Sequence, residues 1–443
     1  MEHTRNLTRG SIPRELTELM LPLLLGNILQ QTYNAADAWI IGRWVGREAF
    51  AAIGVAGTVM NLLIFVLSGA CTGVSVLFSQ FYGAEDLPAF RREGHLALRW
   101  GTAASAALGL AVLPLLSPLL AAIRTPAEVA PYCRAYLVIV ACGLPATYLY
   151  NLFAAMLRSV GNTAAALGSL LAAMAANVAL DLLLTARLGW GVRGAAAATV
   201  LSQAMAAGLC WAYFRRALPE LLPGREDRQA DRDLVGRTVA YGLSAAFHQS
   251  SLYIGKLLVQ GAVNGMGTEL TAAYTAASRI EGFANSFGDS GAAAVSVFIG
   301  QNTGVGDGGR ARRGLWTAFA LMVPLSLALA AALYVPALPA VAWLSGEGGT
   351  VASEGAAYLR TIAAFYVLNY IGSVFVGWFR GRGQVNVPAA GTALHITLRV
   401  VLSYLLIRTM GLRAVALATG LGWALVVSFQ IVVFRVTEKR EGA

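Results

Sequence analysis

Charged residues are scarce in this chain. Asp, Glu, Lys and Arg together make up 13% of the 443 residues, whereas a soluble protein carries about 25%. Hydrophobic residues make up 57%, and they fall in long continuous runs along the whole sequence. The runs do not alternate as the strands of a membrane barrel would. This composition excludes an ordinary soluble protein and predicts an all-α polytopic membrane protein.

Motifs for catalysis and for metal binding are also lacking. The sequence holds no phosphate loop, nucleophile elbow or zinc-protease motif, so we expect neither an enzyme nor an ATP-driven pump. Four Cys in or beside apolar runs, and two His in the second half, have no metal-ligand or redox spacing. We therefore expect no cofactor. These residues are Cys71, Cys133, Cys142, Cys210, His248 and His395.

Positive charge is present, with a net charge of +10, but it lies between the apolar runs. With the N-terminus inside, the inner segments hold twenty Lys and Arg and the outer segments hold seven. This imbalance follows the positive-inside rule and does not favour a nucleic-acid partner. The N-terminus "MEHTRNLTRGSIPRE" is polar and has no cleavable signal peptide. We predict a multi-pass protein of the cell (inner) membrane with both termini in the cytoplasm.

Apolar runs separated by Gly, Pro, Arg or acidic clusters predict twelve transmembrane helices. The expected spans are 17–41, 50–80, 95–119, 130–156, 164–186, 194–215, 238–262, 271–299, 315–335, 355–378, 387–408 and 414–435.

An internal repeat divides these spans into two halves. The segment 78–92, "FSQFYGAEDLPAFRR", matches 299–313, "IGQNTGVGDGGRARR", and "LRSVGNT" matches "FRGRGQV" about 222 residues later. Six helices per repeat give both halves the same orientation, as in many secondary transporters. We predict two pseudo-symmetric six-helix lobes, 1–214 and 238–443, joined by a polar cytoplasmic linker, 215–237.

Polar residues occur inside the spans of the first half, where a charge is costly. On the first span, Gln30, Tyr33, Asn34 and Asp37 follow a helical spacing of three and four. On the fifth span, a second pair of polar residues shares one face, and the fourth and sixth spans each add another. These residues are Asn177, Asp181, Asn151 and Thr199.

Two occupants suit such a site. Asp37 and Asp181 could share a proton, because two nearby carboxylates in a low dielectric do not easily both ionise. Alternatively, Na⁺ could bind among the oxygens of Asp37, Asn177, Asp181 and Thr199. A third interpretation is that the two Asp only bond neighbouring helices. Apart from this possible Na⁺, we expect no metal.

Further polar residues lie in spans of the second half, and they are candidates for a substrate cavity or for structural bonds. Arg279 and Glu281 lie on roughly opposite faces of one helix, so we do not expect them to pair. The candidate cavity residues from both halves are Gln30, Asn34, Glu281, Asp289, Lys256 and Arg399.

The chain resembles the multidrug and toxic compound extrusion (MATE) family through nearly all twelve spans. The resemblance is carried by "LPLLLGNILQQTYNAADAWIIGRWVG", "FSQFYGAEDLPAFRR", "LRSVGNT", "NVALDLLL" and "AYTAASRIEGF" followed by "IGQNTGVGD". It implies two lobes around a cavity that opens alternately to either side. It also implies multidrug efflux, that is, export of xenobiotic organic compounds, often cationic and amphipathic, in exchange for H⁺ or Na⁺.

The resemblance further implies that the chain belongs to the DinF-like branch of this family. A DinF-like member couples through a first-helix Asp and an Asn-x-x-x-Asp pair on the fifth helix. These match Asp37, Asn177 and Asp181, with Tyr33, Asn151 and Thr199 as neighbours. A NorM-like member also uses carboxylates on the seventh and tenth helices, where this chain has none beyond Glu354 at the entrance of the tenth.

Two rival functions remain. A lipid-linked-precursor flippase of the same superfamily would have a strongly cationic cavity, and Lys256, Arg279 and Arg399 keep that alternative open. An intramembrane enzyme could use the paired Asp, but no catalytic motif supports it. We expect small-molecule substrates and the lipid bilayer as partners, no nucleic acid, and a monomer.

Overall fold

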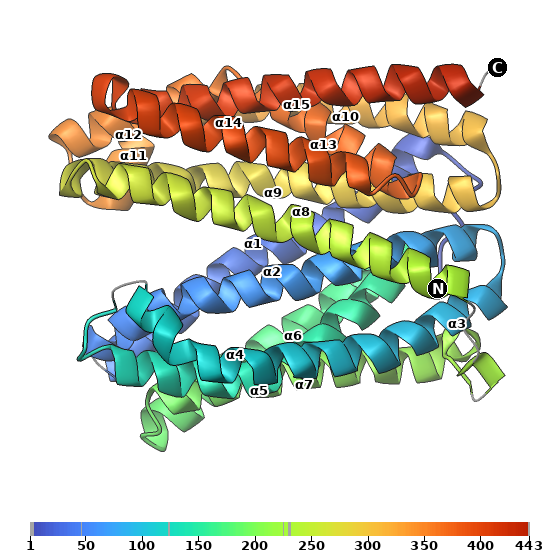
Figure 1. Ribbon diagram of the computed structural model, residues 1–443, viewed down its shortest axis with the longest axis horizontal. Coiled ribbons are helices and arrows are strands. Elements are labelled where there is room, and N and C mark those ends of the chain that lie inside the picture. The colour runs from blue at the N-terminus through green and yellow to red at the C-terminus, as the bar shows by residue number, and fades with distance from the viewer. Residues whose placement is uncertain (1–3, 46, 123–124, 225, 229–231, 442–443) are drawn as a thin grey trace. The chain divides into compact units, whose positions relative to one another are not determined.

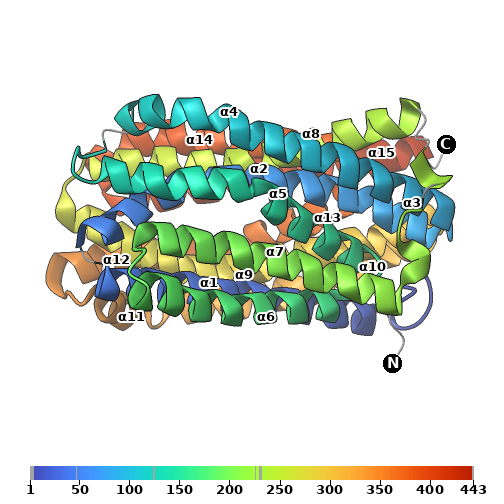
Figure 2. The ribbon, with the colours of Figure 1, turned by 90° about the horizontal axis from the view of Figure 1, so that it is seen from below.

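The computed structural model describes residues 4–441, except 46, 123–124, 225 and 229–231. The side chains at 32–43, 47–48, 50–51, 122 and 441 also lie outside the description. Nearly all of the described chain is helical, and no strand occurs in it (Figures 1 and 2). The all-α prediction is therefore confirmed.

The chain divides into two compact units. Unit 1 comprises Met1–Asn6 and Leu25–Ala246, and unit 2 comprises Leu7–Leu24 and Phe247–Ala443. The helices that lie wholly in unit 1 are α2 (Arg47–Gly83), α3 (Leu87–Leu96), α4 (Thr102–Ala122), α5 (Ala130–Ser159), α6 (Thr163–Asp181) and α7 (Val192–Ala217). Two π-helical segments, Ala97–Gly101 and Leu182–Arg187, follow α3 and α6.

Unit 2 has the same succession of long helices, with two additional breaks. Its helices are α9 (Thr268–Gly304), α10 (Gly308–Tyr334), α11 (Ala337–Ser345), α12 (Gly349–Ala363), α13 (Tyr366–Gly381), α14 (Asn386–Met410) and α15 (Leu412–Glu441).

The first helix of each half begins in the opposite unit. Helix α1 (Ile12–Trp44) belongs to unit 2 up to Leu24 and to unit 1 from Leu25. Helix α8 (Arg232–Asn264) belongs to unit 1 up to Ala246 and to unit 2 from Phe247. The two crossing points are 222 residues apart, as in the sequence repeat. Whether 1–214 and 238–443 act as the transport lobes stays a prediction.

Glycines on α2 let the first part of α8 approach closely. A Cβ at Gly73 would lie 2.1 Å from the Tyr241 carbonyl oxygen, and one at Gly69 would lie 2.7 Å from the Cα of Ala246. Gly69 and Gly73 are four residues apart and so lie on one face of α2. Small residues at this spacing allow two membrane helices to pack backbone against backbone.

We call α1 and α8 the crossing helices, because each continues from one unit into the other. The segments that lead into them are held by polar contacts. In unit 2, Arg310 donates from Nη2 to the carbonyl of Arg9 (2.7 Å), from Nη1 to Gly10 (3.0 Å) and from Nε to Leu7 (3.1 Å). In unit 1, Arg91 pairs with Asp227 of the connecting segment at 3.2 Å. Arg310 therefore holds the segment before α1, and Arg91 holds the segment before α8.

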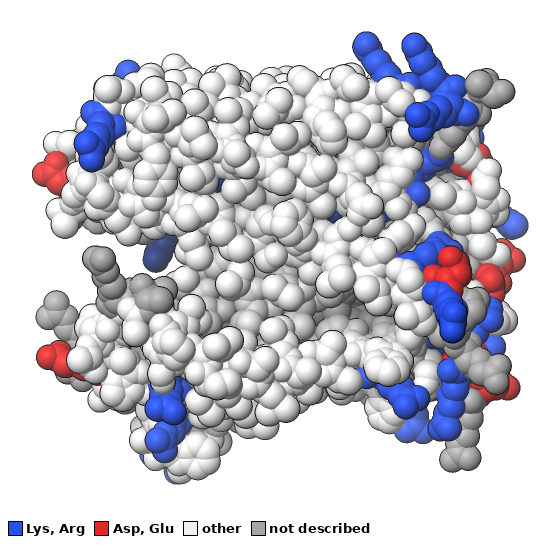
Figure 3. Space-filling model, viewed as in Figure 1, with Lys and Arg blue, Asp and Glu red and all other residues white. Residues whose placement is uncertain are grey.

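All twelve expected spans are helical, but not all are apolar enough to be recognised as spans. In the described part of the chain, eight helices are long and apolar enough to cross a membrane, or nine if α12 and α13 form one bent span. Polar residues such as Lys256 and Asp289 lower the mean hydropathy of α8 and α9. On the face in Figure 3, Lys and Arg gather at the helix ends, as expected for membrane helices.

Two predicted boundaries need correction. The span 355–378 is not one helix, because α12 and α13 meet at a bend of 54°. The Phe365 ring lies at this bend, against Gly420 of α15, where a Cβ would be 2.3 Å away. The linker is also shorter than 215–237, because α7 runs to Ala217 and α8 starts at Arg232. Arg215 and Arg216 suit the C-terminal end of a helix dipole.

Candidate functional site

The predicted pair on the fifth span lies at the C-terminal end of α6. Asn177 is 1% exposed and Asp181 is fully buried, so the shared face points into unit 1. Asp181 is the last residue of α6 before the π-helical segment Leu182–Arg187. Interruptions of this kind are frequent at functional sites. Their role in coupling stays a prediction.

Helix α7 supplies the oxygens opposite Asn177. The Asn177 side chain donates from Nδ2 to Ser202 Oγ at 3.3 Å, and Ser202 Oγ donates to the Thr199 carbonyl at 2.8 Å. Ser202 was not among the predicted site residues, although it lies three residues after Thr199 on the same helix. The buried Asn177 Oδ1 has no hydrogen-bond partner in the described part of unit 1.

For the remaining residues of the predicted coupling site, the hydrogen bonds that the structure describes do not involve Asp181. The side chains of Tyr33, Asn34 and Asp37 lie outside the described residues, so their meeting with Asp181 stays a prediction. Thr199 Oγ1 donates to Ala195 O at 3.0 Å, and Asn151 Nδ2 donates to Thr147 O at 2.8 Å, each within its own helix.

In unit 2, Glu281 is the centre of a buried polar network that sequence reasoning identified only in part. Its Oε2 accepts from Tyr358 OH at 2.6 Å, and its Oε1 accepts from Asn285 Nδ2 at 3.4 Å. Asn285 Oδ1 in turn accepts from Tyr366 and Asn369, at 3.1 and 3.0 Å. The network joins α9 to α12 and α13, so Glu281 has a structural role whatever else it binds.

Three cations accompany this carboxylate. Arg399 on α14 donates from Nη2 to Tyr274 OH at 3.4 Å, and the Tyr274 ring packs edge-on against Tyr358 with centroids 5.5 Å apart. Lys256 on α8 lies within electrostatic range of Glu281, Arg399 and Arg279. Arg279 is exposed while Glu281 is buried, which confirms that the two point in different directions.

Gln30 and Asp289 take no part in the hydrogen bonds that the structure describes for this network. Gln30 and Asp289 are both exposed. Asp289 is within electrostatic range of Arg380, which is buried on α13. The ring nitrogen Nδ1 of His248 lies 2.7 Å from Thr392 Oγ1, which ties α8 to α14. No group of His, Cys, Asp or Glu that could hold a metal occurs among the residues the structure describes.

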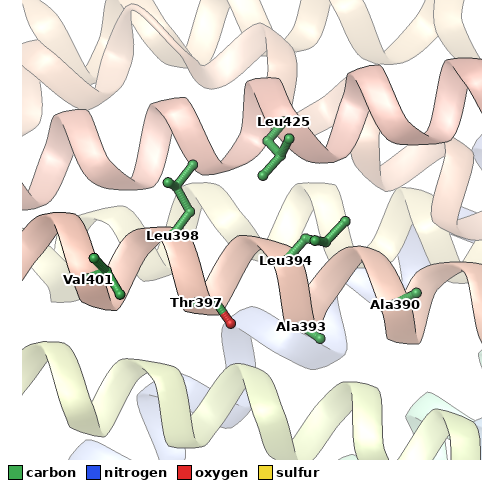
Figure 4. Close-up of a pocket in the computed structure, with 7 residues that line it drawn as sticks. All are labelled: Ala390, Ala393, Leu394, Thr397, Leu398, Val401 and Leu425. Carbon is green, nitrogen blue, oxygen red and sulfur yellow. The ribbon is translucent and has the colours of Figure 1, made fainter.

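One groove on the described surface is apolar, and its lining residues belong to neither polar cluster. It has a volume of about 620 Å³ and is lined mainly by α14, with Leu425 from α15. In Figure 4, Leu398 and Leu425 lie between these two helices, whereas Ala393 and Thr397 lie on the other side of α14. A groove lined in this way suits the lipid side of a membrane helix rather than a polar ligand.

Comparison with known families supports the repeat. The MatE family model matches the chain twice, over residues 22–183 and 245–405. The two matches cover most of the chain and start 223 residues apart, close to the offset in the sequence. The Bacillus subtilis "Probable multidrug resistance protein YpnP" is 25% identical over 94% of both chains. The Chromobacterium violaceum "Probable multidrug resistance protein NorM" is 25% identical over 87% of this chain and 83% of its own.

Solved structures share the fold. A MOP superfamily transporter from Pyrococcus furiosus, whose description refers to a "reverse polarity of binding pocket", superposes with a TM-score of 0.89 at 23% identity over 98% of this chain and 97% of its own. A structure described as "MATE in complex with MaL6" gives a TM-score of 0.90 at 22% identity over the same shares. At this level of identity, the likeness establishes the architecture alone, including the twelve membrane helices.

Proposed function

Since the chain belongs to the multidrug and toxic compound extrusion (MatE) family, we propose that it is a secondary antiporter of the cell membrane. It exports small organic compounds and takes up H⁺ or Na⁺ in exchange. The chain is a multi-pass membrane protein of a family of multidrug efflux transporters, and its named relatives are multidrug resistance proteins. None of them is named as an enzyme or as a lipid flippase, so neither alternative gains support.

The observation that carries the coupling proposal is the burial of Asp181 with Asn177 inside a membrane helix. A buried carboxylate must be protonated, paired or bound to a cation, because an isolated charge in an apolar medium is very costly. The nearby oxygens of Asn177 Oδ1, Ser202 and Thr199 can take part in binding a proton or a hard monovalent cation. Asp37, Tyr33 and Asn151 complete the proposed site.

Coupling requires only that the ion binds one conformation better than the other. Occupation by H⁺ or Na⁺ neutralises Asp37 and Asp181 and makes their close packing less costly. The crossing point of α1 lies between Pro22 and Gly26, where the helix can bend. A shift of α1 there changes unit 1 and favours substrate release. Use of this single site, without a carboxylate partner in the span 238–262 of α8, is the DinF-like scheme.

The test is substrate flux in proteoliposomes, with a pH gradient and a sodium gradient imposed separately. Wild-type protein should move substrate uphill under one of the two gradients without forming a product. The Asp37→Asn variant should insert normally, as judged by its yield and elution profile, and should lose this flux. Wild-type flux in that variant would remove Asp37 from the coupling role, and product formation would point to an enzyme.

A further inference from the structure

The membrane helices of unit 2 carry more positive than negative charge at one place. Lys256, Arg279 and Arg399 accompany a single carboxylate, Glu281. None of the three cations forms an ion pair with any residue that the structure describes. Unpaired charges are rare in membrane helices and usually mark a path or site for a ligand.

The four charges belong to one cluster on three helices of unit 2. Lys256 on α8 is within electrostatic range of Arg279 and Glu281 on α9 and of Arg399 on α14. Direct contacts connect the opposite ends of the cluster, since Arg399 bonds Tyr274, and Tyr274 packs on Tyr358, which bonds Glu281. These three contacts and three electrostatic interactions place the cations around a shared polar region.

Glu281 does not neutralise the cluster. Both of its carboxylate oxygens already accept hydrogen bonds, from Tyr358 at 2.6 Å and from Asn285 at 3.4 Å. One carboxylate also leaves two of the three positive charges without a counter-charge. The electrostatic balance of the cluster therefore favours an additional anion and disfavours an organic cation.

The Arg399 guanidinium has a hydrogen-bond donor that no described residue accepts. Its described hydrogen bond uses Nη2 at the long distance of 3.4 Å, and its Nε is buried without a partner among the described residues. A guanidinium offers five donors in a fork that matches a carboxylate, and a buried donor left without an acceptor is unfavourable. Lys256 and Arg279 are exposed, so a ligand can approach the cluster.

We propose that Arg399, Lys256 and Arg279 bind an acidic group, such as a carboxylate, of the compound that the protein exports. The proposal rests on the proposed transport function and narrows its substrate class to organic acids and zwitterions. It departs from the cationic substrates that the family resemblance implies. Arg399 contacts the acidic group, and Lys256 and Arg279 add attraction from the exposed side.

The experiment measures equilibrium binding to purified protein in detergent, without any gradient. Fluorescein, an amphipathic carboxylate dye, and rhodamine 6G, a dye of similar size with a positive charge, serve as probes for fluorescence polarisation. Fluorescein should bind the wild-type protein more tightly. Arg399→Gln should weaken fluorescein binding roughly tenfold or more, the effect of losing a charge-assisted hydrogen bond. Arg399→Lys should weaken it less.

The matched control is Arg408→Gln, because Arg408 is exposed near the end of the same helix. It should leave fluorescein binding unchanged. Tighter binding of rhodamine 6G than of fluorescein, or equal losses in Arg399→Gln and Arg408→Gln, would overturn the proposal. Displacement of fluorescein by millimolar phosphate or chloride would show a site for inorganic anions and would also overturn it.

Failure of the transport function is distinguishable from failure of this site. Asp37→Asn should abolish gradient-driven flux but retain fluorescein binding, because Asp37 belongs to unit 1. If wild-type protein binds fluorescein with the expected dependence on Arg399 but shows no coupled flux, the coupling scheme fails and the anion site stands. If flux is coupled and fluorescein does not bind, the anion site fails alone.

Discussion

The two units differ in charge at corresponding positions of the repeat. On α6, the neutral Asn177 and the acidic Asp181 are both buried, whereas 222 residues later α14 carries the basic Arg399 and the neutral Ser403. Helix position, neighbouring spans and burial are similar, so the fold alone does not require a carboxylate there. This difference is the basis of the two proposals, a cation site in unit 1 and a site for an acidic group in unit 2.

The largest expected effect comes from breaking this asymmetry at the acidic position. Asp181→Asn keeps the size of the side chain and removes its charge and its site for a proton. Gradient-driven flux in proteoliposomes should fall to that of empty liposomes. Ser403→Ala, at the corresponding position of unit 2, should retain most of the flux. Equal losses in both variants would mean that the position matters for packing rather than for coupling.

A second comparison concerns the crossing helices. Gly73 of α2 lies directly against the backbone of α8, whereas the residue 222 positions later on α9 is Val295, which is 2% exposed. Gly73→Val should destabilise the protein by about 3 kcal/mol, because a rigid side chain must push two backbones apart. Thermal unfolding in detergent measures the loss.

The control for Gly73 is Gly57→Val. Gly57 lies on the same helix, and a Cβ there would meet nothing within 4 Å. This variant should keep the wild-type unfolding temperature. If both variants lose the same stability, the close approach of α2 and α8 is not the reason why residue 73 must be small.

The sequence was sufficient for much of this architecture. Continuous apolar runs predicted the twelve helical segments, and the helical spacing of Asn177 and Asp181 predicted their shared buried face. The repeat was confirmed by two matches of one family model. Features that depend on local periodicity were therefore predictable.

Long-range features were not predictable in this way. The exchange of α1 and α8 between the units leaves no mark on their apolar pattern. The bend between α12 and α13 has neither Pro nor Gly at 363–366, and the Phe365 ring at the bend packs on Gly420, which is far away in the sequence. Asn285, a partner of Glu281, lies four residues away on the same helix, but Tyr358 lies 77 residues away on another helix, so no spacing rule finds it.

The two Arg side chains that hold the segments before the crossing helices differ in burial. We therefore expect their substitution by Ala to reduce stability unequally. Arg310 is 8% exposed and makes three hydrogen bonds to backbone carbonyls. Arg310→Ala should cost about 2 kcal/mol, since it leaves buried carbonyls without a charged donor. Arg91 is more exposed in its pair with Asp227, so Arg91→Ala should cost less than about 1 kcal/mol.

Unfolding temperatures of the two Arg variants in detergent decide this comparison. A larger loss in Arg91→Ala than in Arg310→Ala would show that the connecting segment, and not the N-terminal segment, is the tighter anchor. Salt provides a second test, because the partly exposed Arg91 pair is screened more than the buried Arg310 hydrogen bonds are. High salt should therefore reduce the effect of Arg91→Ala alone.

The smallest expected effect is a change in ion affinity at the acidic site of unit 1. Ser202→Ala removes the hydroxyl that accepts from Asn177 Nδ2, but it leaves Asn177 and Asp181 in place. Loss of one such hydrogen bond is worth a factor of roughly three to ten in ion affinity. The ion concentration that gives half-maximal flux should rise by this factor, while the maximal flux is retained.

Ser169 provides the control for this last variant, because it is buried on the same helix as Asn177, its hydroxyl donates to Ala165 O at 3.1 Å, and it lies beside Cys210 of α7. Ser169→Ala should leave the half-maximal ion concentration unchanged. A shift in both variants would reflect general loosening of α6 against α7. A shift in Ser202→Ala alone would show that the amide of Asn177 must be held from α7 for the carboxylate beside it to select its ion.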